Sequence, residues 1–306
     1  MNEMQSIWHN GALVPWKACK VHILTHGLHY GSGIFEGIRA YQTDQGAAVF
    51  KLKEHMARFM YSANALGMKL PYTQKELEDA VCLTVQANNL EAGYIRPVAF
   101  YGYDELGVVP KVNSPIDVAV ACWPWGKYLA SDQIDVEISQ YIRIHPKSTV
   151  ADAKICGHYV NSLLSKLASN QQKYHEVLML DSEGFVAEMS ASNIFIVKNN
   201  KVYTTEEGTI LVGITRNVVM DILRTKGYEV IETKFTPEDI INADEAFVCG
   251  TAVEVVSMRS LNDQLINDAQ LGEVTAFVKD AYHKIVTGCD ARYRDALTLV
   301  SEYSIS

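Results

Sequence analysis

The hydrophobic pattern of this 306-residue chain lapses at Gly126–Gln133, where the sequence GKYLASDQ is polar and irregular. On both sides of this segment, apolar residues recur at the spacings of strands and helices. A chain of this length, with 48% hydrophobic residues, can fill two cores. We therefore predict an α+β protein with a small N-terminal domain (1–125), a linker (126–133) and a larger C-terminal domain (134–306).

The N-terminal part shows separate strand and helix signals. An Asn10-Gly11 turn between two apolar runs predicts a β-hairpin over Ser6–Ala18. Strand-like Tyr94–Tyr101 contains Pro97, which lacks an N–H and places this strand at an edge or a bulge. The other predicted elements are a strand over Ala47–Lys51, helices over Glu54–Leu66 and Lys75–Asn88, and a strand over Ile116–Trp125.

The C-terminal part begins with a predicted strand over Ile134–Ile144. Three short strands with turns between them predict an antiparallel meander over Glu176–Asp181, Phe185–Glu188 and Asn193–Lys198. Helices are expected at Gly213–Thr225, closed by Gly227 at its C-terminus, at Pro237–Asn242 and at Gly272–Val286, with strands at Glu229–Lys234 and Glu245–Cys249.

Composition excludes several classes of function. A net charge of −9 argues against a nucleic-acid surface, which needs clustered Lys and Arg. No run of about 18 apolar residues predicts a membrane span, and the N-terminus has no secretory pattern. The six cysteines form no C-x-x-C pair, so we expect reduced thiols, a cytoplasmic protein and no metal site.

A loop that carries Lys154 precedes an apolar-periodic helix within Ala151–Ala168. A lysine before a helix is usually a solvated surface charge. Here its neighbours are small or apolar, and Tyr159 follows five residues later. Desolvation disfavours the charged ammonium, so Lys154 is a candidate for a neutral amine that forms a Schiff base with a carbonyl cofactor.

Four further features suit such a cofactor, although each also has an ordinary structural explanation. Glu188 follows a short strand and could pair with a ring nitrogen. Gly213-Ile214-Thr215 opens a helix, where free N–H groups favour a phosphate. Gly250-Thr251-Ala252 could add a second set of donors, and Arg58 could add a charge-assisted bond.

An ordered series of blocks resembles branched-chain amino acid aminotransferase, a fold-type IV enzyme that uses pyridoxal 5′-phosphate. These blocks are YGSGIFEGIRAY (30–41), EHMARF (54–59), YIRP (94–97), PWGKYL (124–129), AKICGHYVNSLL (153–164), EGFVAEMSASNIF (183–195), GITR (213–216) and CGTAVEV (249–255). The resemblance implies a D-amino acid aminotransferase-like fold with a barrel-like larger domain. It also implies reversible transfer of the amino group of L-leucine, L-isoleucine or L-valine to 2-oxoglutarate, in branched-chain amino acid biosynthesis.

The same resemblance assigns the cofactor contacts residue by residue. It implies that Lys154 holds pyridoxal 5′-phosphate as a Schiff base and moves the proton of the reaction. It implies that Glu188 pairs with the ring nitrogen and that Tyr159 bonds the phenolic oxygen. The phosphate contacts that it implies are Arg58, the amides of Ile214 and Thr215, and Thr251.

Substrate contacts and assembly also follow from the resemblance. Tyr94 with the amides of Thr251 and Ala252 is implied to bind the α-carboxylate, and Arg96 with Tyr30 the second carboxylate of glutamate. The implied side-chain pocket is lined by Tyr30, Phe35, Gly37, Trp125 and Tyr128. Because Tyr30 and the loop near Val108 reach a neighbouring subunit's site in this family, the implied assembly is a homodimer or a trimer of dimers.

Other functions stay open at this point. A transaminase for D-amino acids or (R)-amines, or a lyase acting on aminodeoxychorismate, would share the fold and the lysine, and a non-catalytic cofactor-binding protein would share the site. Cys156 and His158 stand where the family more often has glycine and asparagine, and Asp104-Glu105 adds two acids to a loop that is more neutral in many relatives. If they face the site, these acids would repel a dicarboxylate.

Overall fold

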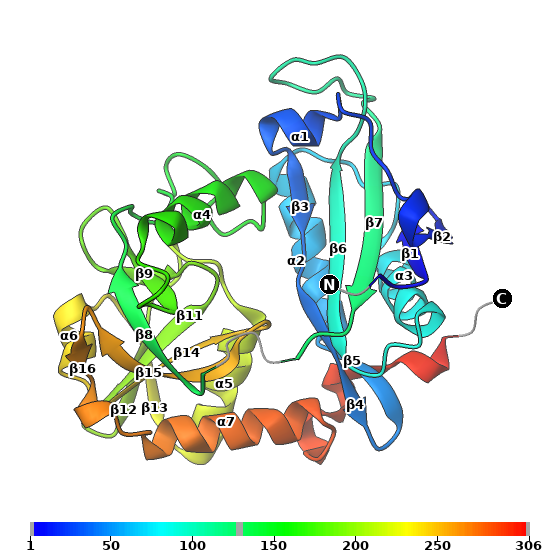
Figure 1. Ribbon diagram of the computed structural model, residues 1–306. Coiled ribbons are helices and arrows are strands. Elements are labelled where there is room, and N and C mark those ends of the chain that lie inside the picture. The colour runs from blue at the N-terminus through cyan, green and yellow to red at the C-terminus, as the bar shows by residue number, and fades with distance from the viewer. Residues whose placement is uncertain (1–2, 127–130, 304–306) are drawn as a thin grey trace. The chain divides into compact units, whose positions relative to one another are not determined.

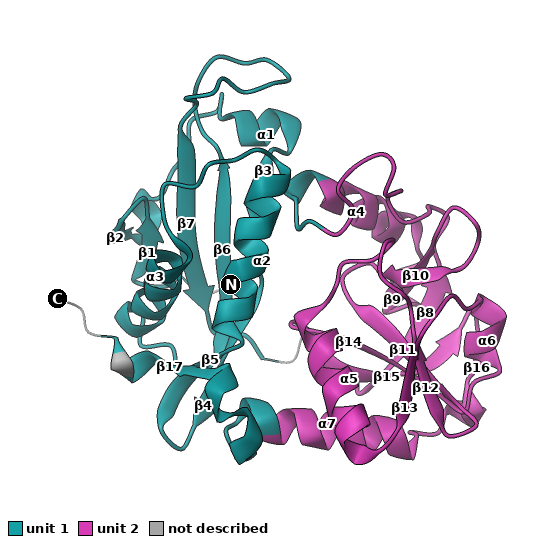
Figure 2. Ribbon diagram, turned by 180° about the vertical axis from the view of Figure 1, so that it is seen from behind, with its two compact units in different colours: residues 1–126, 153–157, 285–306 teal, residues 127–152, 158–284 magenta. Residues whose placement is uncertain are grey.

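The chain forms two compact units in the computed structural model, which describes residues 3–126 and 131–303 (Figure 1). Unit 1 comprises the described residues of 1–126, 153–157 and 285–306, and unit 2 those of 127–152 and 158–284 (Figure 2). Part of the predicted linker, residues 127–130, lies outside the described residues. None of the described helices is long and apolar enough to cross a membrane.

Unit 1 is built on an antiparallel sheet with the strand order β17-β5-β4-β6-β7-β1-β2, to which β3 adds by pairing with β6. The strands are β1 (Ser6–His9), β2 (Ala12–Pro15), β3 (Gly33–Phe35), β4 (Ile38–Thr43), β5 (Gly46–Phe50), β6 (Gly93–Tyr101), β7 (Ile116–Trp123) and β17 (Leu297–Leu299). Helices α2 (Leu52–Ala65) and α3 (Gln74–Ala87) cover one face of this sheet (Figures 1 and 2). Their apolar stripes and the sheet share one buried core.

The predicted hairpin is confirmed, with β1 and β2 paired around Asn10-Gly11. Both turn residues have positive φ, 48° and 95°, as a tight two-residue hairpin turn requires. Helices α2 and α3 also lie where the 3.6-residue periodicity predicts helices, and a Thr73–Glu76 capping box begins α3.

Of the two positions predicted for the strand of Pro97, an edge or a bulge, the edge is wrong, because β6 lies inside the sheet. It pairs with β7 along its whole length, and with β4 and β3 on its other side. The N–H and C=O of one residue point the same way in an antiparallel ladder, and the Pro97 carbonyl accepts from the N–H of Glu36. The missing N–H therefore faces the interruption between β3 and β4, where the Glu36–Pro97 pair keeps one ladder bond and lacks the return bond.

Unit 2 contains a mixed, curled sheet with the strand order β10-β9-β8-β15-β14-β11-β12-β13, and β16 added beside β15 (Figure 1). The strands are β8 (Gln133–Ile138), β9 (Glu176–Leu180), β10 (Val186–Met189), β11 (Asn193–Lys198), β12 (Lys201–Thr204), β13 (Glu229–Glu232), β14 (Glu245–Gly250), β15 (Glu254–Leu261) and β16 (Gln264–Leu265). The helices are α4 (Tyr159–Ala168), α5 (Ile214–Lys226), α6 (Pro237–Ile241) and α7 (Glu273–Val286), of which α7 continues into unit 1.

Two strand predictions in unit 2 are corrected. The three short strands form no meander, because β11 pairs with β14 and β12 instead of β10. That pairing joins segments about 50 residues apart, which a local pattern cannot show. The strand predicted over Ile134–Ile144 ends at Ile138, where Ser139 turns the chain by bonding the backbone of Tyr141.

Segments 153–157 and 285–306 belong to unit 1, although both follow the predicted linker in sequence. Ile155 forms a β-bridge with Ile34, and β17 adds to the edge of the sheet beside β5. The lysine singled out in the sequence, Lys154, therefore lies in unit 1, while the helix after it, α4, lies in unit 2.

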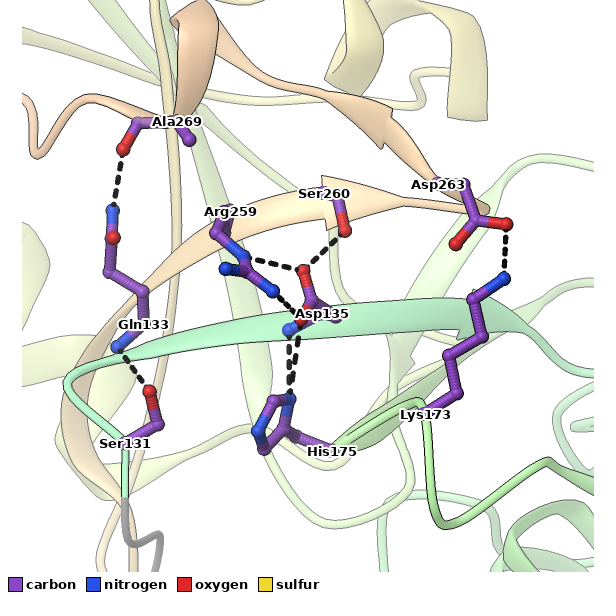
Figure 3. A network of polar contacts seen from close by, with 9 residues as sticks. All are labelled: Ser131, Gln133, Asp135, Lys173, His175, Arg259, Ser260, Asp263 and Ala269. Carbon is purple, nitrogen blue, oxygen red and sulfur yellow. Dashed lines mark hydrogen bonds and ion pairs between the residues drawn. The ribbon is translucent and has the colours of Figure 1, made fainter.

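Asp135 joins three strands of unit 2 through a polar network (Figure 3). Its carboxylate accepts from Ser260 Oγ at 2.6 Å and forms a bidentate ion pair with Arg259, both on the neighbouring strand β15. Its N–H donates to His175 Nδ1 at 3.1 Å, just before β9. These bonds, the one from Arg259 first, lower the pKa of the Asp135 carboxyl despite its burial.

We expect Asp135→Ala to lower the free energy of unfolding by about 1–3 kcal/mol, because Arg259 and Ser260 lose their shared acceptor. Chemical denaturation of the purified variant measures the change. Asp280→Ala, which removes an exposed ion pair with Lys284 on α7, is the matched control and should change stability little. Equal stability of the Asp135 variant and the wild type would contradict this role.

Candidate active site

Lys154 is clamped by its backbone within unit 1. Its N–H donates to Ser62 Oγ on α2 at 2.9 Å, and its carbonyl accepts from the N–H of Phe35 at 3.2 Å. Its ammonium lies 4.9 Å from the centroid of the Phe35 ring. The backbone therefore holds the lysine at a fixed position between β3 and α2, and the side chain is half-buried.

One face of α2 carries polar groups toward this lysine segment. His55, Arg58 and Ser62 recur at helical spacing on that face. The Ser62 hydroxyl donates to the Arg58 carbonyl at 2.9 Å while it accepts from Lys154. The sequence predicts Arg58 as a site residue but gives no sign of Ser62, whose role depends on a contact 92 residues away.

Several predicted substrate-binding residues lie on β3 and β6, just before β4 and just after β7 in unit 1. The Arg96 guanidinium lies over the Phe35 ring at 4.6 Å and the Tyr94 ring at 5.5 Å. Its buried Nε has no partner among the described residues. Trp125 packs edge-on against Tyr94 at 4.4 Å. A Cβ at Gly37 would lie 1.9 Å from the Tyr94 hydroxyl, so a larger residue there would displace the Tyr94 side chain.

Tyr30 and the loop near Val108 lie apart from this group. Tyr30, in α1 (His26–Tyr30), packs on His26 at 4.5 Å and stays 43% exposed. Val108 is 81% exposed. Tyr128 lies outside the described residues.

Glu188 of unit 2 is a buried carboxylate at the end of β10. Arg143 Nε donates to it at 2.6 Å, and the N–H of Leu211 donates at 3.2 Å to both of its oxygens. Asn193 Nδ2 adds a contact of 3.3 Å. Sequence reasoning predicts Glu188 but misses Arg143; a lone cation in the apolar run Tyr141–Ile144 is the only signal.

The N-terminus of α5 presents free donors in unit 2. Gly213 is its N-cap and supplies no side-chain cap, so the first N–H groups, from Ile214 onward, keep their donor capacity. A Cβ at Gly213 would lie 2.0 Å from Asn193 Oδ1, so a larger residue there would displace the Asn193 side chain. Thr215, a predicted phosphate contact, is buried in this first turn.

A second loop carries Thr251 and Ala252, both half-buried, directly after β14. Gly250, just before them, packs against Ser192, and a Cβ there would lie 3.3 Å from the Ser192 side chain. The Ser192 hydroxyl is buried and has no partner among the described residues. Tyr159, the remaining predicted cofactor contact, is the first residue of α4 and is half-buried.

Comparison with known proteins identifies the family. The model of the class IV aminotransferases matches residues 33–261. The chain belongs to the class IV aminotransferase family. The branched-chain-amino-acid aminotransferase of Pseudomonas aeruginosa is 39% identical over 298 residues, which cover 96% of this chain and 97% of that protein. That of Escherichia coli K12 is 35% identical over 287 residues, which cover 92% and 93%.

The fold of this chain is also similar to solved structures of aminotransferases over nearly its whole length. The T.th. branched-chain amino acid aminotransferase complexed with N-(5′-phosphopyridoxyl)-L-glutamate matches with a TM-score of 0.95 and 40% identity, over 98% of this chain and 100% of that one. The same enzyme with pyridoxamine 5′-phosphate gives 0.95 and 39%, with the same coverage. The predictions of the family, the enzyme class and the two-part α+β fold of type IV are confirmed.

The residues of this class IV aminotransferase fit pyridoxal 5′-phosphate. The chain offers a clamped lysine, a buried carboxylate for a ring nitrogen and an uncapped helix N-terminus for a phosphate. Buried polar atoms are normally hydrogen-bonded, yet Arg96 Nε and Ser192 Oγ have no partner among the described residues. Both are therefore suited to meeting a polar group of a bound molecule.

Proposed function

We propose that this aminotransferase transfers the amino group of L-leucine, L-isoleucine or L-valine to 2-oxoglutarate with pyridoxal 5′-phosphate. The observation that carries this proposal is the clamped Lys154, whose N–H and C=O are both bonded within unit 1. A fixed backbone limits the positions that the side-chain amine can reach, and a covalent catalyst needs its nucleophile held near the atom that it attacks. The likeness to branched-chain aminotransferases along nearly the whole chain supports the choice of substrates.

We assign the proton transfer to Lys154. Its Nζ would hold the cofactor at its aldehyde carbon, and once an amino acid has taken that place, the freed amine would move the proton between the substrate's Cα and that same carbon. When bound, the cofactor supplies an electron-withdrawing ring that stabilises negative charge at Cα. Glu188 keeps a proton on the ring nitrogen, and Tyr159 donates to the ring's phenolic oxygen.

The phosphate contacts that we propose combine charge with backbone donors. Arg58 offers a guanidinium, and Ile214 and Thr215 offer N–H groups at the positive end of the α5 dipole. Thr251 adds its hydroxyl and its N–H.

The proposed substrate contacts explain how one pocket accepts both apolar and acidic side chains. Tyr94 and the N–H groups of Thr251 and Ala252 take the α-carboxylate, while Phe35, Gly37, Trp125, Tyr128 and Tyr30 line the side-chain pocket. Arg96 takes the second carboxylate of glutamate. When leucine is bound, the guanidinium of Arg96 still has cation–π contacts with the Phe35 and Tyr94 rings. These contacts stabilise its positive charge beside the apolar side chain of leucine.

We also propose that a second copy of the chain covers two exposed apolar surfaces. On α4 the predicted apolar stripe, Val160, Leu163, Leu164 and Leu167, is exposed. In unit 1, Ile23, Leu28, Val108, Val109 and Val112 are exposed around α1 and the loop after β6. Patches of this kind are rare on monomers, which supports a homodimer or a trimer of dimers.

Asp104, Glu105 and His158, which depart from the family pattern, each contact a polar or charged side chain nearby. Asp104 accepts from Ser114 at 2.8 Å, and this bond is the main cause that lowers the pKa of Asp104, while Glu105 pairs with Lys111 at 2.8 Å. His158 Nε2 contacts Thr149 Oγ1 at 2.7 Å. Because these acids have partners in their own loop, their repulsion of a dicarboxylate is reduced, which supports glutamate as a substrate.

An assay with L-leucine and 2-oxoglutarate tests the proposed function. Cofactor-loaded protein should form glutamate and 4-methyl-2-oxopentanoate, and no glutamate would exclude the proposal. Consumption of D-leucine alone would instead indicate the D-amino acid transaminase, and pyruvate released from aminodeoxychorismate would indicate the lyase. An absorption spectrum that L-leucine leaves unchanged would indicate a non-catalytic protein.

A further inference from the structure

Glu36 is a fully buried carboxylate that the proposed chemistry leaves without a role. Its side chain has no exposed surface, and it lies in the interruption between β3 and β4. Its N–H bonds the Pro97 carbonyl at 2.9 Å, so the sheet fixes its backbone. The YGSGIFEG block contains this glutamate, but the resemblance assigns it no contact.

Two side chains from α2 meet this carboxylate. Arg58 donates from Nε to Oε1 at 2.7 Å and from Nη2 to Oε2 at 2.9 Å, a bidentate pair. His55 Nδ1 lies 2.8 Å from Oε2. Because Glu36 bonds the Nε–Nη2 edge of the guanidinium, the plane and direction of the Arg58 side chain are set by a buried carboxylate whose backbone is bonded to the sheet.

The charges of Glu36 and Arg58 balance when Glu36 is ionised and His55 is neutral. Burial would raise the pKa of Glu36, but the Arg58 guanidinium and His55 outweigh it and hold the pKa well below its usual range. Burial lowers the pKa of His55, so the imidazole donates to Glu36 without adding a second positive charge. Glu36 therefore remains an anion and orients Arg58 at neutral pH.

We propose that Glu36 is a positioning residue for the cofactor's phosphate, acting through the guanidinium of Arg58 with support from His55. The proposal rests on the proposed function, in which Arg58 contacts that phosphate. A purely structural ion pair would stabilise unit 1 but would not distinguish a phosphorylated cofactor from an unphosphorylated one. That difference gives the test.

The experiment titrates cofactor-free full-length protein with pyridoxal 5′-phosphate and with pyridoxal, followed by visible absorption. Glu36→Gln should weaken binding of pyridoxal 5′-phosphate by about ten- to a hundredfold, because a neutral amide no longer orients the guanidinium. Binding of pyridoxal, which has no phosphate, should be almost unchanged. Glu78→Gln, at another buried glutamate of unit 1 on α3, is the matched control and should change neither.

A second measurement assigns the effect to Arg58. In an Arg58→Ala background, Glu36→Gln should cause no further loss of preference for the phosphorylated cofactor. If Glu36→Gln does not fold, Glu36→Asp keeps the charge but withdraws the carboxylate by one methylene, and it should show the same phosphate-specific loss. Equal weakening of both cofactors, or weakening of neither, would overturn the role of Glu36 and leave the proposed function standing. Wild-type protein that bound neither cofactor would overturn both.

Discussion

Lys154→Ala is expected to lower the rate of amino transfer by about 10⁴-fold or more, because one side chain supplies both the covalent attachment and the proton carrier. The fold should survive, since the hydrogen bonds of this residue with Ser62 and Phe35 are made by its backbone. Steady-state turnover with L-leucine and 2-oxoglutarate measures the loss, and circular dichroism checks the fold.

The control for this variant is Lys147→Ala, which removes an exposed lysine from the same stretch of chain and should leave the rate unchanged. The binding of the cofactor gives a second readout. The Lys154 variant should release pyridoxal 5′-phosphate on gel filtration, whereas the wild type should retain it. Turnover near the wild-type rate would remove Lys154 from the mechanism.

Glu188→Gln is expected to lower turnover by about 10²- to 10³-fold, because a neutral amide no longer keeps a proton on the ring nitrogen. The structure adds a second consequence. Arg143 donates to Glu188 at 2.6 Å and is buried, so the variant leaves its positive charge without this partner. We therefore expect lower stability as well as lower turnover.

Two comparisons separate these consequences. Glu176→Gln changes another buried glutamate of unit 2 and should cost stability without a comparable loss of turnover. Arg143→Lys keeps a cation beside Glu188 and should retain more activity than Glu188→Gln, although it loses the planar geometry of the guanidinium. A Glu188→Gln enzyme with wild-type turnover would exclude the carboxylate from the chemistry.

The elements of the fold that depend on local pattern could be predicted from the sequence. The Asn10-Gly11 hairpin, the helices α2 and α3, and the glycine that closes α5 at Gly227 all lie where turn chemistry and periodicity place them. What could not be predicted was long-range pairing. The proline at position 97 predicts an edge strand or a bulge. The structure tolerates it inside the sheet because the neighbouring strands, β3 and β4, are interrupted opposite Pro97.

The same division holds for the candidate site. Lys154 stands out in the sequence because its neighbours are small or apolar. Glu188 stands out because it lies in one of the ordered blocks that resemble the family. The groups that hold them, Ser62 and Arg143, are ordinary residues of a helix and a loop, 92 and 45 positions away. No spacing rule connects such pairs, because the connection is made by sheet pairing and helix packing.

The apolar stripe on α4 shows a further limit of sequence patterns. Val160, Leu163, Leu164 and Leu167 have the periodicity of a core-facing helix, yet they are exposed in the single chain. A pattern reports that a face is apolar but not whether the same chain or a second copy covers it.

Reduction of the cofactor-loaded enzyme with borohydride, followed by peptide mapping, tests the central claim most directly. The reduction converts the bond between a lysine and the cofactor into a stable amine that mass spectrometry can locate. We predict the added pyridoxyl phosphate mass on the peptide that contains Lys154 and on no other. The same mass at a different lysine, or no labelled peptide from enzyme that transfers amino groups, would contradict the account.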